Sequence, residues 1–154
     1  MAHSILVLGI GNVLMCDDGA GVHAARGFEA FDDEDLRVVD GGTLGLSLLT
    51  EVESCAALIV FDAARYGAPP GAVRTFAGDA MDLQLSGKKQ TAHEVALFDL
   101  LATAELIGRK PARRALIGVE PGRVDWGLEP TPEVALAIPE MRRAARDLLE
   151  TWAS

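Results

Sequence analysis

The amino-acid sequence predicts an α/β fold, a three-layer sandwich in which a mostly parallel, five-stranded sheet carries helices on both faces. Strand-like and helix-like patterns alternate along the chain, which is typical of this fold class. Residues 5–10 and 57–61 are continuous apolar runs, as expected of strands that are buried on both faces. With 154 residues the chain fits one domain, which we assign to residues 1–154.

The composition excludes several classes of protein. A hydrophobic fraction of 49% and a charged fraction of 24% are ordinary for a globular protein. The formal net charge of −9 argues against a nucleic-acid partner, because phosphate contacts need a surplus of Lys and Arg. The one basic cluster is predicted to be a solvated edge; it comprises Arg109, Lys110, Arg113 and Arg114.

The first apolar run indicates where the protein works. Residues 5–10 are too few to span a membrane and have no basic flank or cleavage site. The two cysteines, Cys16 and Cys55, form no CxxC pair and cannot build a disulfide framework, which suits a reducing compartment. We therefore expect a cytoplasmic protein with no membrane partner.

The first half of the chain is predicted to contain three strands and two helices. Each strand is a short run of β-branched and other apolar residues. Asp17 or Asp18 is available as the N-cap of the first helix. In order, the elements are a strand at 5–10, a helix at 19–31, a strand at 36–39, a helix at 44–52 and a strand at 57–61.

The second half is predicted to contain two strands, two helices and a long loop. Prolines and a glycine at 68–71 form a turn before an edge strand, and the polar stretch 78–90 reads as a loop. The helix after it would bury Val95, Leu97, Phe98, Leu100, Leu101 and Leu106. In order, the elements are an edge strand at 73–76, a helix at 93–107, a strand at 115–119 and a helix at 131–152 with Pro132 in its first turn.

Acidic residues follow the first and the third predicted strands, at the sheet edge where ligands of such sheets bind. Asp17 and Asp18 come after the first strand. One of them could cap the next helix, but this structural role accounts for only one of the two acids. Asp62 closes the third strand, where a bond to a loop amide is the structural explanation. In such sheets the first and third strands are often neighbours at the point where the strand order reverses. We therefore expect Asp18 and Asp62 to lie close together.

The glycines after the first strand also suggest a dinucleotide-binding site. Gly9 and Gly11 begin a G-x-G-x-x-G pattern, and Asp40 follows the second strand as a possible ribose acceptor. The third glycine is replaced by Leu14, however, and the next glycine is Gly19. No helix N-terminus is then placed to bind a pyrophosphate, so the sequence disfavours this interpretation.

The segment Thr91-Ala92-His93-Glu94 is a capping box, with Thr91 as N-cap and Glu94 at the third helical position. His93 is then in the first helical turn, where the positive end of the helix dipole disfavours imidazolium. A neutral imidazole is a good metal ligand. His23, in the middle of a helix, and His3, near the N-terminus, are predicted to be surface residues.

One imidazole and two carboxylates suit a divalent transition metal with coordination positions left open. Asp18, Asp62 and His93 supply this set. No HExxH motif is present, which argues against a permanent zinc protease site. A Cys16–His93 nucleophilic pair is the alternative, but the acids beside Cys16 disfavour its thiolate. We therefore expect Cys16 to be a loop residue and Cys55 a core residue.

Five sequence blocks match a known family in order, between Ile5 and Leu149. They are Gly9-Ile-Gly-Asn-Val-Leu-Met-Cys-Asp-Asp-Gly19, Asp40-Gly-Gly-Thr43, Phe61-Asp-Ala63, His93 at a helix start and Ile117-Gly-Val-Glu-Pro121. They resemble those of the nickel–iron hydrogenase maturation proteases. The resemblance implies a phosphorylase/hydrolase-like domain and an endopeptidase. Such an enzyme removes the C-terminal extension of a hydrogenase large-subunit precursor after nickel insertion.

The resemblance also implies which residues act. The family's metal-contacting positions fall on Asp18, Asp62 and His93, which would be both the catalytic and the nickel-binding residues. The nickel would be supplied by the substrate, with another divalent cation as a surrogate. Many relatives carry Glu at the first position, so the choice between Asp17 and Asp18 stays open. Whether the metal or an aspartate performs the hydrolysis also stays open.

Further assignments come from the same blocks. The block at 40–43 is assigned to site architecture or to binding of the substrate tail. Two other functions remain open from the sequence: a small nucleotide-binding oxidoreductase domain, favoured by Gly9, Gly11 and Asp40, and a non-enzymatic nickel carrier with the same three ligands. Tight NAD binding would favour the oxidoreductase, tight nickel retention the carrier and weak metal binding the protease.

Overall fold

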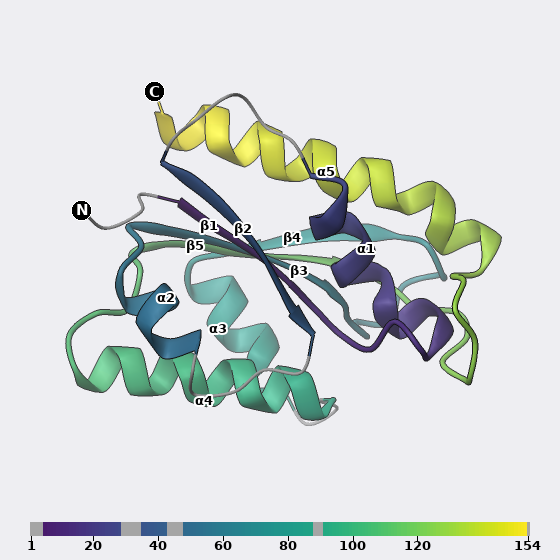
Figure 1. Cartoon of the computed structure of the whole chain (residues 1–154), viewed down its shortest axis with the longest axis horizontal. Helices are drawn as coiled ribbons and strands as arrows, with labels where there is room; N and C mark the ends of the chain where they lie inside the picture. The colour runs from purple at the N-terminus through teal and green to yellow at the C-terminus, as the bar shows by residue number, and fades with distance from the viewer. Residues whose placement is uncertain (1–4, 29–34, 43–47, 88–90, 154) are drawn as a thin grey trace.

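The computed structural model describes residues 5–28, 35–42, 48–87 and 91–153, which form the three-layer sandwich shown in Figure 1. The middle layer is one five-stranded sheet in the order β2-β1-β3-β5-β4. Four strands are parallel, and β4 is an antiparallel edge strand. The predicted fold class is confirmed. The strands are β1 (Ile5–Ile10), β2 (Leu36–Gly42), β3 (Ala57–Ala63), β4 (Val73–Ala77) and β5 (Arg113–Val119).

Helices cover both faces of the sheet. One face packs against α1 (Ala20–Arg26) and α5 (Pro132–Ala153), and the other against α2 (Leu49–Glu53), α3 (Asp79–Leu85) and α4 (Ala92–Leu106). A 3₁₀ turn, η1 (Cys16–Gly19), connects the end of β1 to α1. No helix in the described ranges is long and apolar enough to cross a bilayer.

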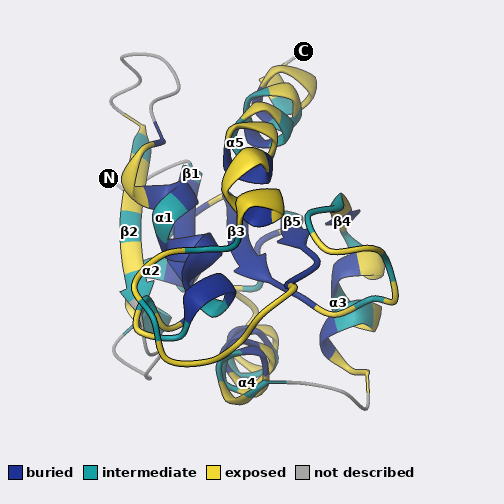
Figure 2. Cartoon of the chain, turned by 90° about the vertical axis from the view of Figure 1, so that its right-hand side faces the viewer, coloured by how far each residue is buried: buried dark blue, intermediate teal, exposed yellow. Residues whose placement is uncertain are grey.

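The side chains of the strands alternate between two hydrophobic cores. In β3, Ile59 and Phe61 pack with α1 and α5, whereas Leu58 and Val60 pack with α2, α3 and α4. Figure 2, which views the end of the sheet where the parallel strands finish, shows these buried strands between the two helical layers. Because successive side chains of a strand point to opposite faces, the same alternation directs Asp62 toward α4.

The glycines near the end of β1 allow the chain to pack closely. A Cβ added at Gly21 would lie 2.2 Å from the Phe61 carbonyl oxygen, and one at Gly9 would lie 2.5 Å from the Ala25 Cβ. Gly11 has φ +125°, and a Cβ there would lie 2.0 Å from the Asp18 carbonyl oxygen. Helix α1 therefore lies directly on β1 and β3. This packing explains the glycine pattern without a dinucleotide.

Several element boundaries differ from the prediction. The helix expected at 19–31 covers Ala20–Arg26, and residues 29–31 of that prediction lie outside the described ranges. Its N-cap is Gly19, so neither Asp17 nor Asp18 caps it. The helix expected at 44–52 is α2, and residues 43–47 lie outside the described ranges. β2, β3 and β5 are each longer than predicted, so Asp62 lies inside β3 rather than after it.

The predicted loop at 78–90 contains helix α3, and this prediction was wrong. Met81 and Leu85, which are one helical turn apart, are fully buried in the core on the α4 side. Two acids in its first turn, Asp79 and Asp82, stabilise α3, because negative charge interacts favourably with the positive end of the helix dipole. One of them, Asp82, accepts hydrogen bonds from Lys110 and Arg114. These two basic residues therefore bind α3 and do not form a solvated edge.

The buried face of α4 also differs from the prediction. Leu97, Leu100 and Leu101 are buried as expected, but Val95, Phe98 and Leu106 are exposed. The remaining buried positions are Glu94 and Ala104.

His23 was predicted to be a surface residue, yet its Nε2 is buried and has no partner within the described residues. His3 lies outside the described ranges.

Candidate active site

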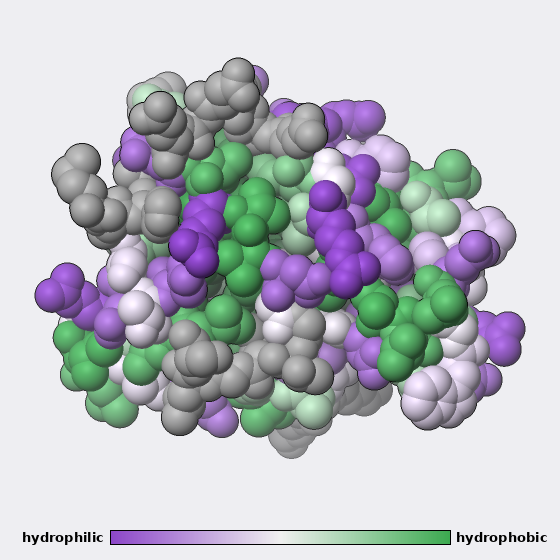
Figure 3. Space-filling model, viewed as in Figure 1, coloured by the Kyte–Doolittle hydropathy of each residue, from purple (hydrophilic) through white to green (hydrophobic). Residues whose placement is uncertain are grey.

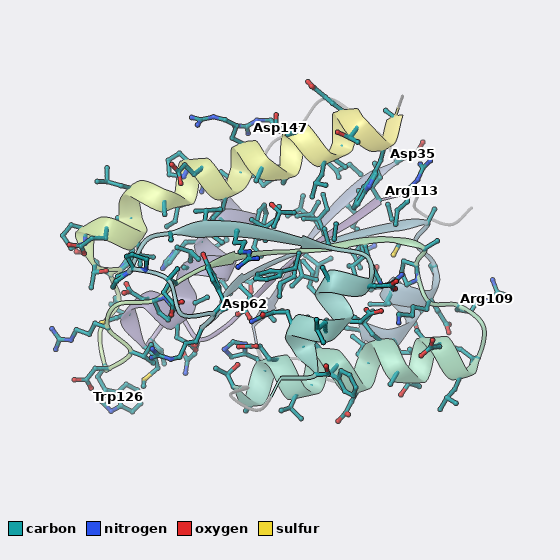
Figure 4. The ribbon with its side chains drawn as sticks, turned by 180° about the vertical axis from the view of Figure 1, so that it is seen from behind. Asp35, Asp62, Arg109, Arg113, Trp126 and Asp147 are labelled. Carbon is teal, nitrogen blue, oxygen red and sulfur yellow. The ribbon has the colours of Figure 1, made fainter. Side chains whose placement is uncertain are left out.

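Three layers of the fold contribute one predicted site residue each. Asp18 comes from the η1 turn beside α1, Asp62 from β3 in the sheet, and His93 from the first turn of α4. β1 and β3 are neighbours, which brings their carboxyl ends together. Figure 4 shows Asp62 between the sheet and the start of α4. The structure therefore brings together all three residues that the sequence singled out.

The His93 ring lies between the two carboxylates. Its Nε2 is 2.9 Å from Asp18 Oδ1, and its Nδ1 is 3.3 Å from Asp62 Oδ1 and 3.1 Å from Thr91 Oγ1. Burial raises the pKa of Asp18, but the hydrogen bond and charge of His93 and the Asn12 N–H outweigh it, so the net pKa is lowered. The side chains of His93 and Asp18 remain 12% and 13% exposed, so solvent reaches this side of the site.

Asp62 is the most deeply buried group of the site. It is fully buried, and neither carboxylate oxygen has a hydrogen-bond partner within the described residues. Burial, with the negative charges of Glu94 and Asp18, outweighs the nearby Ala63 N–H and raises its pKa well above the usual value. A buried carboxylate without a donor is unstable unless a cation or a proton compensates it. The residues present therefore fit a divalent metal.

Glu94 belongs to the same cluster, although the sequence had assigned it only to the helix cap. Its side chain is buried, and Oε1 accepts a hydrogen bond of 3.2 Å from Thr91 Oγ1. Thr91 is confirmed as the N-cap, because the Glu94 N–H donates to Thr91 Oγ1, while the Glu94 carboxylate accepts from the Thr91 hydroxyl. One possible ligand atom from each of Asp62, His93 and Glu94 lies within 4.8 Å of the others.

A signal for Glu94 was present in the sequence. The buried residues of α4 recur at 94, 97, 101 and 104, which is the spacing of one helical face. Glu94 is therefore a carboxylate on an apolar face that packs against the sheet. Burial raises its pKa, the Thr91 hydrogen bonds and His93 oppose this, and Asp18 adds to it, so the net pKa is raised.

Asp17 has a structural role, which separates it from Asp18. It is fully buried, and its carboxylate accepts hydrogen bonds from the N–H groups of Gly122, Arg123 and Thr131 and from the Thr131 hydroxyl. Burial raises the pKa of Asp17, but these hydrogen bonds outweigh it and the net pKa is lowered. Asp17 therefore fixes the segment after β5, and Asp18 is the acid that faces His93.

The cysteines are both buried. Cys16 has φ 50°, its N–H donates to the Gly127 carbonyl, and a Cβ added at Gly127 would lie 2.6 Å from its sulfur. No hydrogen bond joins Cys16 to His93 in the part of the chain that the structure describes. Cys55 is a core residue as predicted; its thiol donates to the Val52 carbonyl, and burial raises its pKa to about 11.

Asp40, the other acid considered from the sequence, binds the end of α1. Its Oδ2 lies 2.9 Å from Arg26 Nη2. It lies on β2 opposite Gly9 of β1, whereas Asp62 lies on β3, on the other side of β1. Thr43 of the same sequence block falls outside the described ranges.

Exposed apolar side chains lie on the two segments beside Asp18. A β-bridge joins Met15 to Gly127, so the chain around residue 14 runs next to the segment after β5. Trp126 projects from the surface in Figure 4, and hydrophobic side chains gather at the right-hand end of the face in Figure 3. The exposed apolar residues of these segments are Leu14, Val124, Trp126 and Leu128.

Comparisons with known proteins identify the family of this chain. The family model for hydrogenase maturation protease matches residues 22–147. The hydrogenase expression/formation protein HupD of Rhizobium leguminosarum bv. viciae is 38% identical over 154 residues, covering 98% of this chain and 76% of that protein. The hydrogenase 2 maturation protease of Escherichia coli (strain K12) is 30% identical over 151 residues, covering 93% and 91%.

The fold comparison agrees with these sequence matches. The hydrogenase maturating endopeptidase HybD from E. coli superimposes with a TM-score of 0.90 at 27% identity, covering 96% of this chain and 93% of that one. These matches favour the protease over the oxidoreductase and the nickel carrier. The chain belongs to the hydrogenase maturation protease family.

Proposed function

We propose that this endopeptidase removes the C-terminal extension of a nickel–iron hydrogenase large-subunit precursor after nickel insertion, and that it recognises the nickel held in that substrate. Asp18, Asp62 and His93 are the residues that bind the metal. The observation that supports this assignment is the buried Asp62 carboxylate, which faces an imidazole and has no hydrogen-bond donor within the described residues. A cation brought by the substrate compensates this charge.

The ligand types fit a metal that is shared with the substrate. Two carboxylates and one imidazole leave coordination positions that thiolates of the precursor fill, and soft sulfur ligands strengthen the binding of nickel. The metal then serves as the recognition signal and aligns the scissile bond beside the site. An aspartate of the site activates the water for hydrolysis. Asp18 suits this role, because solvent reaches it.

The surroundings of the site fit a polypeptide substrate. The apolar residues Leu14, Val124, Trp126 and Leu128 are exposed beside Asp18, where a precursor would lie. Apolar and aromatic side chains are enriched in protein interfaces. We place the reaction in the cytoplasm, which the two free cysteines support, because free thiols suit a reducing compartment.

Nickel-free and nickel-loaded precursor, each incubated with chelator-treated enzyme, test this proposal. We expect cleavage of the nickel-loaded precursor only, measured as the loss of the extension by mass spectrometry. Free nickel added to the protease alone should not restore cleavage of the nickel-free precursor. Equal cleavage of both precursors would contradict nickel recognition and would leave Asp18, Asp62 and His93 as direct catalytic groups.

A further inference from the structure

Glu94 is more deeply buried than a capping role requires. The third residue of a capping box needs only to reach back to the N-cap residue at the helix end, where solvent is near. Glu94 is 2% exposed, and it lies on the face of α4 that packs against the sheet. Ionised carboxylates are almost never this deeply buried unless a positive charge compensates them.

The two nitrogens of His93 face different partners. Nε2 faces Asp18, whereas Nδ1 faces Asp62 and Thr91. The described residues that bring one ligand atom each within 4.8 Å of one another are Asp62, His93 and Glu94, and Asp18 is not among them. Asp62 is an independent sign that this cluster can bind a cation, because it is fully buried, lies in the cluster and has no hydrogen-bond partner within the described residues.

We propose that Glu94 is a further metal ligand of this site and forms a compact set with Asp62 and His93. Asp18 faces the other nitrogen of the His93 ring in this structure and lies outside that compact set. The Thr91 hydroxyl donates to one Glu94 oxygen and fixes the direction of the carboxylate. Such outer hydrogen bonds orient metal ligands. The identity of the cation, nickel held by the substrate, rests on the proposed function, but the ligand set does not.

A third carboxylate changes the charge of the site. Asp18, Asp62 and Glu94 together carry three negative charges when ionised, which exceeds the two positive charges of one divalent ion. This excess of negative charge makes the site bind a cation in preference to a neutral ligand. Without the metal, it also repels an anionic group of the substrate. Glu94 thereby makes binding of the substrate more dependent on the metal.

Glu94→Gln is the variant that separates the two roles. Glutamine is accepted at the third position of a capping box, so the helix cap should stay intact and the variant should be at least as stable as the wild type. The variant lacks the ligating charge, so we expect its affinity for Ni²⁺ to fall about tenfold or more. Isothermal titration of the purified protein with Ni²⁺ alone measures this. Glu105→Gln is the matched control, since its carboxylate is 68% exposed near the other end of α4.

A second measurement needs no variant. Carboxyl ¹³C resonances of the wild-type protein, followed during a titration with diamagnetic Cd²⁺, should show Glu94, Asp62 and the His93 ring shifting along one saturation curve. A Glu94 resonance that stays in place while His93 shifts would overturn the inference, as would wild-type affinity of Glu94→Gln for Ni²⁺. Absence of any Ni²⁺ binding by wild type at millimolar concentration would overturn it too.

The two proposals fail in different experiments. The metal titrations contain no precursor, so their result does not depend on which protein is cleaved. Nickel-independent cleavage of the precursor contradicts the proposed function and leaves the ligand set intact. Unchanged Ni²⁺ affinity in Glu94→Gln contradicts the ligand set and leaves the proposed function intact.

Discussion

Two adjacent aspartates show how strongly position within a turn determines the role of a side chain. Asp17 and Asp18 are neighbours in η1, yet Asp17 points into the protein and Asp18 toward His93. The donors that bind Asp17 lie 105 to 114 residues later in the chain. The choice between the two acids, left open by the sequence, therefore depends on a contact that no local pattern encodes.

Asp17→Asn should destabilise the protein by about 2–4 kcal/mol, because an amide cannot accept all the hydrogen bonds that the carboxylate accepts. The folded-state pKa of Asp17 is lowered, so its contribution to stability is present above the ordinary pKa of an aspartate and is lost as the pH falls through the lowered value. Urea unfolding at several pH values measures this. Equal losses for Asp17→Asn and the exposed Asp125→Asn would contradict the structural role.

Asp62→Asn should have the opposite effect on stability. Its folded-state pKa is raised, so ionisation of this buried group destabilises the fold, and the destabilisation grows as the pH rises from the ordinary aspartate value toward the raised one. We expect the variant to gain about 1–3 kcal/mol near neutral pH and nothing in acid. Precursor cleavage should be lost. A destabilised variant would show that Asp62 has a donor partner in the metal-free protein.

His93→Ala and Cys16→Ser form a matched pair that distinguishes the metal site from cysteine chemistry. His93→Ala should abolish cleavage, because it removes the ring that joins Asp18 and Asp62. Cys16→Ser should leave cleavage largely intact, because the buried thiol packs against Gly127. Mass spectrometry of the precursor and circular dichroism of each variant are the measurements. Loss of cleavage in a folded Cys16→Ser would revive the cysteine mechanism.

Helices and strands could be predicted where the sequence carries a strong local pattern, such as a continuous apolar run or a helix N-cap. β1 and β3 are continuous apolar runs, and Thr91 marks the start of α4, so the meeting of Asp18, Asp62 and His93 could be predicted. The exact positions could not, because Asp18 does not cap α1 and Asp62 lies inside β3. Helix α3 was missed because it is short, buries only Met81 and Leu85, and leaves its third large apolar residue, Leu83, exposed. Glu94 was missed because the capping box already explained a glutamate at that position.

The contact of α1 with the sheet gives an element-scale prediction. In Gly21→Ala the new Cβ would meet the Phe61 and Ile10 carbonyl oxygens at 2.2 and 2.6 Å, so the helix must move away. We expect a loss of about 1–3 kcal/mol, as for overpacked cores, together with weaker metal binding, because Asp18 directly precedes α1. Thermal unfolding and Ni²⁺ titration measure both effects.

Gly87→Ala provides the control for this prediction. Among the described residues, a Cβ there meets only the Gln84 carbonyl oxygen, at an ordinary 3.4 Å. Its stability and metal affinity should match those of the wild type. A Gly21→Ala protein with wild-type stability would mean that α1 can shift outward at no cost, which the close packing of this layer argues against.

At the scale of the whole molecule, the site is a junction of all three layers. η1 lies beside α1, Asp62 is in the sheet, and His93 and Glu94 are on α4, so no single layer holds a ligand set. We expect Ni²⁺ binding and the native tryptophan emission spectrum to be lost at the same urea concentration, because Trp152 packs against the core. Metal binding that is lost well before the global transition would show that α4 separates from the sheet on its own.

The position of β5 in the sheet has a consequence for synthesis on the ribosome. Every proposed ligand has been translated once residue 94 is made, but β3, which carries Asp62, pairs with β1 on one side and with β5 on the other. A nascent chain that ends before Arg113–Val119 exposes β3 as a bare apolar edge. Such a chain already contains all its ligands, but the strand that carries Asp62 lacks its second neighbour. Metal binding is therefore acquired late, after the central strand has found its second neighbour.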